Sequence, residues 1–170
     1  ESTAHNLVAN DTPDTWDVFV HDRQTGLTSL VSQSTSGEKS NNASVSPLIS
    51  GEGRYVYFGS DSTNLVANDT NNADDIFVRD LQANTTSLVS VSSSGEQGND
   101  DSITFSISND GRYMAFISKA SNLVPNDTNG VSDLFVHDLQ TGQTIRLTDG
   151  LRSEQPNDGS FEISISGDGQ

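Results

Sequence analysis

The sequence NLVANDT stands at residues 6–12, returns unchanged at residues 64–70, and returns once more as NLVPNDT at residues 122–128. The three copies are equally spaced, and the register then holds without a gap. Residues 6–63 and 64–121 are identical at 30 of 58 positions, which chance does not produce. A fixed period of this kind is the signature of a repeat architecture. The repeats are 1–58, 59–116 and 117–170, the last of them incomplete.

Each repeat holds four segments with the pattern of strands. In the clearest set, strands a, b, c and d are predicted at residues 103–108, 112–118, 133–138 and 144–148. Strand a alternates apolar and polar residues, which predicts one buried face. Between strands a and b, Asn109-Asp110-Gly111 predicts a tight hairpin turn, because glycine supplies the positive φ that such turns need. Four antiparallel strands per repeat predict an all-β fold of β-propeller blades, as part of a larger propeller or array.

The loops between these strands differ in length. The a–b and c–d turns are short, whereas the b–c and d–a connections are long and polar. Alternate connections of an antiparallel meander emerge at the same end of the strands, so both long loops of each blade are expected on one face. Function usually resides in long loops on a rigid scaffold. We therefore expect any binding site on that face.

The repeat also carries a recognisable motif. It reads Ser108-Asn109-Asp110-Gly111-Arg112-Tyr113 with Phe116 and Ser118, then Asn122-Leu123-Val124, then Asp133-Leu134-Phe135-Val136 and Asp138. This pattern resembles the TolB-type, WD-repeat-like β-propeller family over essentially all of the chain. The resemblance implies blade architecture and a bacterial envelope or extracellular setting. It implies no activity, because propellers host many, and the repeat is longer than a usual blade of this family.

Composition narrows the classes of partner. Lys and Arg number 8 against 24 Asp and Glu, which gives a net charge of −16. Nucleic acid and anionic membranes demand basic residues, so neither is an expected partner. No apolar run approaches the length of a membrane-spanning helix, which is about 20 residues. Without cysteine there is neither a disulfide nor a reactive thiol.

The b–c loops contain a recurring acidic pattern, Asp-x-Asn-x-x-x-Asp. Ca²⁺ prefers six to eight oxygen ligands, which carboxylates, Asn carbonyls and main-chain carbonyls of a tight loop supply. The pattern predicts calcium sites in the second and third repeats. In the first repeat Pro13 replaces the Asn, so that site is expected either to be weaker or to use Asp14 instead. The predicted ligands are Asp69, Asn71 and Asp75, then Asp127, Asn129 and Asp133, then Asp11 and Asp17.

An alternative explains the same residues without metal. Asn and Asp dominate turns because their side chains hydrogen-bond nearby main-chain groups. Asp17, Asp75 and Asp133 could then simply tie each loop to the start of strand c. With three His and no Cys, transition metals are not expected.

The function expected from these features is a non-catalytic β-propeller scaffold or binding module with calcium-stabilised loops, secreted, periplasmic or on the cell surface. No Ser/His/Asp arrangement recurs, so we do not expect an enzyme. Its partners would be a protein or glycan ligand, other copies of itself, or the rest of a longer chain. One alternative is a structural subunit that assembles end to end into an array, filament or surface layer. Another is the propeller domain of a lyase or peptidase.

At the ends of the chain the repeat predicts an incomplete blade. By register, Gln170 matches Arg112 and Glu1 matches Ile117, so the apolar centre of one strand b lies between them in the repeat. We expect a longer array or a neighbouring copy to complete that blade, because an unpaired sheet edge is avoided.

Overall fold

The computed structural model describes residues 1–4, 6–9, 15–147, 156–159 and 162–169, and it is all-β. The described strands are β1 (Phe19–His21), β2 (Thr28–Leu30), β3 (Ser44–Ile49), β4 (Tyr55–Ser60), β5 (Asp75–Asp80), β6 (Thr85–Leu88), β7 (Ser102–Ile107), β8 (Tyr113–Ser118), β9 (Asp133–Asp138) and β10 (Gln143–Arg146).

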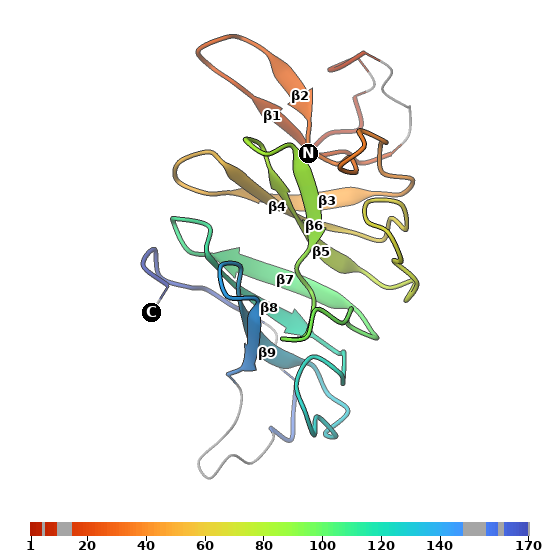
Figure 1. Cartoon of the computed structure of the whole chain (residues 1–170), viewed down its shortest axis with the longest axis vertical. Coiled ribbons are helices and arrows are strands. Elements are labelled where there is room, and N and C mark those ends of the chain that lie inside the picture. Colours follow the sequence, from red (N-terminus) through yellow and green to blue (C-terminus); the bar gives the residue numbers. More distant parts are fainter. Residues whose placement is uncertain (5, 10–14, 148–155, 160–161, 170) are drawn as a thin grey trace.

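These strands form three antiparallel sheets, which follow one another down the molecule in Figure 1. The first sheet contains β1 and β2, the second is the meander β3-β4-β5-β6, and the third is the meander β7-β8-β9-β10. Ser44 and Ser102, which open the two four-stranded sheets, occupy the same position of successive repeats. The predicted fold class of repeated four-stranded antiparallel blades is therefore confirmed, and the predicted strand ends are correct to within two residues.

Local sequence explains where the chain turns. Gly53 and Gly111, in the a–b hairpins, have φ values of 72° and 70°. Asp110 completes its turn by accepting hydrogen bonds from Ser108 Oγ and the Arg112 amide. Strand a carries a bulge in both four-stranded sheets, where Ser46 and Thr104 take positive φ.

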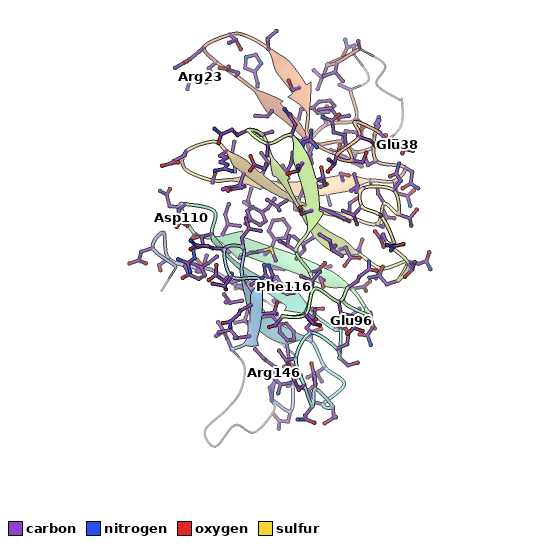
Figure 2. All side chains as sticks on the ribbon, in the orientation of Figure 1. Arg23, Glu38, Glu96, Asp110, Phe116 and Arg146 are labelled. Carbon is purple, nitrogen blue, oxygen red and sulfur yellow. The ribbon has the colours of Figure 1, made fainter. Side chains whose placement is uncertain are left out.

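The second sheet is buried on both faces, because successive side chains of a strand point in opposite directions. Val56 and Phe58 pack with Val18 and Val31, which flank the two strands of the first sheet. On the other face, Tyr57 packs in a second cluster with side chains of the third sheet, including Met114, Phe116 and Phe135. Figure 2 places Phe116 between these two sheets. Neighbouring blades therefore form the core together, as expected of a repeat protein.

Turns of neighbouring blades are also in direct contact. The Gly51 amide donates to the Asn109 carbonyl at 2.7 Å, and the Asn109 amide donates to the Gly167 carbonyl at 2.8 Å. A Cβ on Gly51 would stand 2.3 Å from Asn109 Oδ1, so the Asn109 side chain would have to move to admit one. The contact recurs at one-repeat intervals and fixes the spacing of the blades at their hairpin ends.

The long loops lie on the side of the molecule opposite the hairpins, as predicted. In Figure 2, Arg23 and Asp110 mark hairpin turns on the left, whereas Glu38 and Glu96 mark d–a loops on the right. The long loops are the d–a connections 31–43 and 89–101 and the b–c connections 61–74 and 119–132. The described residues include no helix with the length and hydrophobicity of a membrane span.

Candidate functional site on the long-loop face

The b–c loop of the second sheet is centred on a buried carboxylate. Asp75 is 0% exposed at the start of β5. One of its oxygens accepts from Ser90 Oγ at 2.6 Å, and the other accepts from Asn71 Nδ2 at 2.9 Å and Gln97 Nε2 at 2.8 Å. Burial, opposed by these hydrogen bonds and aided by the charge of Asp69, raises the pKa of Asp75.

Gln97 joins this carboxylate to a second one. Its Nε2 also donates to Asp69 Oδ1 at 2.8 Å. The structure thus brings together the three predicted residues Asp69, Asn71 and Asp75, with the Gln97 amide between the two carboxylates. Asn71 also closes an Asx turn, because its Oδ1 accepts from the Ala73 amide.

The equivalent loop of the third sheet has the same arrangement but a different donor. Asp133 is 0% exposed and accepts from Asn129 Nδ2 at 3.0 Å. Arg146, on β10, places one guanidinium nitrogen 3.2 Å from both Asp127 and Asp133. The Arg146 and Asp127 side chains are only 7% and 5% exposed, so this is a buried ionic triad. Burial and the nearby Asp133 raise the pKa of Asp127.

Next to the first sheet, the buried carboxylate is paired with a lysine. Lys39 Nζ lies 2.7 Å from Asp17, which is 1% exposed. Asp17 also accepts from Ser32 and Ser40 hydroxyls. The other residue predicted for this site, Asp11, lies outside the described residues. Lys39 and Gln97 are one repeat apart, so one position of the d–a loop serves both junctions.

These hydrogen bonds match the alternative raised from sequence, in which the recurring Asp ties its loop to the start of strand c. Within the described ranges, no group of three or more acidic, His or Cys side chains is arranged to hold a metal ion. Calcium coordination by the predicted residues stays a prediction. Sequence reasoning missed Gln97, Lys39 and Arg146. The one signal was at position 146, where an Arg replaces the Leu of the other two repeats.

The d–a loops are tied to the following blade as well as to the preceding one. Asn122, in the b–c loop of the third sheet, accepts from the Asn99 amide and donates to the Gln97 carbonyl. Asn64 does the same one repeat earlier, with the Asn41 amide and the Lys39 carbonyl. Both described d–a loops, 31–43 and 89–101, are therefore held by hydrogen bonds or ion pairs on both sides.

Comparison with known proteins gives matches of fold only. No protein-family model matches the chain, and no curated protein does. Similar solved structures include TolB from Acinetobacter baumannii, with a TM-score of 0.46 and 18% identity over 78% of this chain and 26% of that one. A putative TolB from Agrobacterium tumefaciens gives a TM-score of 0.47 and 15% identity over 77% and 40%.

A third similar structure is an oligogalacturonate lyase from Vibrio parahaemolyticus, with a TM-score of 0.43 and 11% identity over 76% of this chain and 32% of that one. The chain spans between a quarter and two fifths of the length of these three structures. Two of them are TolB proteins, the family that the repeat motif resembles.

Proposed function

We propose that the chain is a non-catalytic β-propeller binding module of an extracellular or envelope protein, and that its long loops form a preordered binding face. The observation that supports this most directly is the double attachment of each d–a loop. Lys39 or Gln97 fixes the loop to the blade before it, and Asn64 or Asn122 fixes it to the blade after it. Loops held in this way lose little conformational entropy on binding, which favours affinity.

The proposal includes a calcium site in one loop, that of residues 68–75. The Gln97 and Asn71 side chains are amides, and rotation by half a turn exchanges their nitrogen for an oxygen. They would then present two carbonyl oxygens beside the carboxylates of Asp69 and Asp75, the hard donors that Ca²⁺ prefers. In the loop of residues 126–133 the bridging group that the structure describes is instead the guanidinium of Arg146, which has no acceptor atom.

The binding proposal is tested by screening peptide and glycan arrays with two variants of equal charge. Ser94→Arg places a bulky side chain on the long-loop face, whereas Gln82→Arg places one in an exposed c–d hairpin on the opposite face. We expect saturable binding that Ser94→Arg removes and Gln82→Arg retains. Binding lost only in Gln82→Arg, or no saturable binding to either array, would contradict the proposal.

A further inference from the structure

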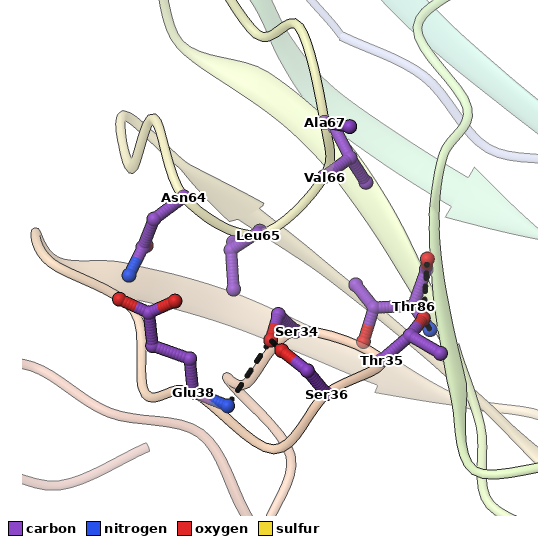
Figure 3. Close-up of a pocket in the computed structure, with 9 residues that line it drawn as sticks. All are labelled: Ser34, Thr35, Ser36, Glu38, Asn64, Leu65, Val66, Ala67 and Thr86. Atoms are coloured by element: carbon purple, nitrogen blue, oxygen red, sulfur yellow. Dashed lines mark hydrogen bonds between the residues drawn. The ribbon is translucent and has the colours of Figure 1, made fainter.

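Two equivalent pockets lie on the long-loop face, one at each junction between blades. The first, of about 620 Å³, lies between the d–a loop 31–43 and the b–c loop 61–74, and Figure 3 shows it. The second, of about 510 Å³, lies between the loops 89–101 and 119–132. Each of the nine residues that line the first pocket has its counterpart, one repeat later, in the lining of the second. The pocket is therefore a property of the repeat.

An acidic group stands at one end of each pocket. Figure 3 shows the Glu38 carboxylate turned toward the Asn64 side chain, and one repeat later Asn122 Nδ2 donates to Glu96 Oε1 at 3.3 Å. Both glutamates are exposed. Neither has a Lys, Arg or His partner among the residues that the structure describes. By contrast, the recurring Asp80 and Asp138 are paired with Arg54 and Arg112.

The rest of each pocket is apolar along one side and carries hydroxyls along the other. Leu65 and Leu123 are each 1% exposed, and the valine that follows each leucine is partly buried. Opposite them, Ser34 and Ser36 hydroxyls lie 2.8 Å apart, as do those of Ser92 and Ser94. No basic side chain lines either pocket.

We propose that each pocket binds a Lys or Arg side chain, and that the two pockets together bind an extended basic segment of a partner protein. Such a side chain has an apolar stem and a cationic head, which match the Leu-Val wall and the glutamate that has no basic partner among the described residues. The net charge of −16 attracts a basic partner over a long range. This inference rests on the proposed function, because it names the partner of the long-loop face.

Repetition of the pocket predicts multivalent binding. A segment that fills both pockets makes its second contact within the complex already formed, at a high effective concentration. Disabling one pocket should therefore lower the affinity for a polyvalent ligand by more than the loss of a single exposed ion pair would.

The experiment is calorimetric titration with a synthetic peptide of alternating Lys and Ser, about ten residues long. Its controls are the same peptide with Gln for Lys and a neutral oligosaccharide. We expect Glu38→Gln and Glu96→Gln each to weaken binding about tenfold and the double variant about a hundredfold. Glu52→Gln removes the same charge from an exposed hairpin turn and should change affinity less than about twofold.

Chemical shifts of the methyl groups of Leu65, Val66, Leu123 and Val124 would locate the peptide. Equal losses in Glu38→Gln and Glu52→Gln would overturn the inference, because general attraction would then account for binding. Failure of the lysine peptide to bind would overturn it too. If the oligosaccharide or the Gln peptide instead binds the long-loop face, the proposed function stands and the inference about its partner fails.

Discussion

The loops 68–75 and 126–133 occupy the same place in successive blades, yet they hold their paired carboxylates by different chemistry. In the first, a neutral amide from the d–a loop bridges Asp69 and Asp75. In the second, the guanidinium of Arg146, from β10, bridges Asp127 and Asp133. The donor comes from a different element and carries a different charge, but the bridged pair is the same. Among the described residues, a carboxylate pair is thus bridged by an amide in one loop and by a guanidinium in the other.

The largest effect is expected from Arg146→Leu, which restores the residue of the other repeats. It leaves Asp127 and Asp133 buried without their cation, and breaking a buried ion pair costs about 3–5 kcal/mol. Urea unfolding would measure the loss of stability. A loss of less than about 1 kcal/mol, the range of exposed pairs, would show that the triad contributes no more than a surface contact.

Acid-to-amide substitutions should show how much each loop's buried carboxylate contributes to folding stability. Asp133→Asn should cost most, since it removes the charge of one of the two carboxylates that pair with the buried Arg146 guanidinium. Asp75→Asn should cost about 1–3 kcal/mol, because a new NH₂ group would face the donors of Asn71 and Gln97. Asp61→Asn, at an exposed position, is the control and should change stability by less than about 0.5 kcal/mol. If all three changes have equal, small effects in thermal unfolding, the recurring acid is not structural.

The next largest effect is expected from calcium, which should stabilise the fold by binding to loop 68–75. With calcium at a hundred times its dissociation constant, a site confined to the folded state adds about 2.7 kcal/mol, which a chelator would reverse in a melting scan. Gln97→Lys, which copies Lys39, should abolish this response by filling the site with an ammonium group. The prediction of a calcium site in loop 68–75 would be contradicted if calcium still stabilised Gln97→Lys. It would also be contradicted if calcium did not stabilise the unmodified chain.

The smallest effect concerns the strand c residue that contacts a threonine of strand d. His137 is 5% exposed and bonds Thr144, whereas Arg79 bonds the equivalent Thr86. Burial lowers the pKa of His137 below 6.5. The unfolded chain then binds the proton more readily, so stability should fall as the pH drops below 6.5. His137→Gln should remove this part of the pH dependence. Identical pH profiles for the two proteins would contradict the expectation.

Much of this fold follows from the sequence, because its information is local and repeated. The period of the repeat predicts where each strand lies in every blade. The alternating pattern identifies strand a, and the glycine of the hairpin turn marks the boundary between strands a and b. The predicted start of strand c at Asp133 coincides with the first residue of β9. Convergence of acidic residues in the b–c loops was also predictable from their spacing.

The bridging donors were not predictable, since they come from distant positions. Gln97 follows Asp75 by 22 residues and reaches it only because the d–a loop folds back across the blade. Arg146 lies at a strand position where the other repeats have Leu. The sequence therefore does not distinguish an Arg146 side chain that faces solvent from one that contacts the b–c loop. The recurring pockets were missed for the same reason, because two loops of different blades make each one.

We infer that the long loops are ordered before any ligand binds. It is tested most directly by ¹⁵N relaxation of the free protein in loops 61–74 and 119–132. The bridged carboxylates and the Asn64 and Asn122 contacts predict order parameters near those of the strands, about 0.85. Order parameters below about 0.6 across both loops, the range of flexible backbone, would contradict the claim.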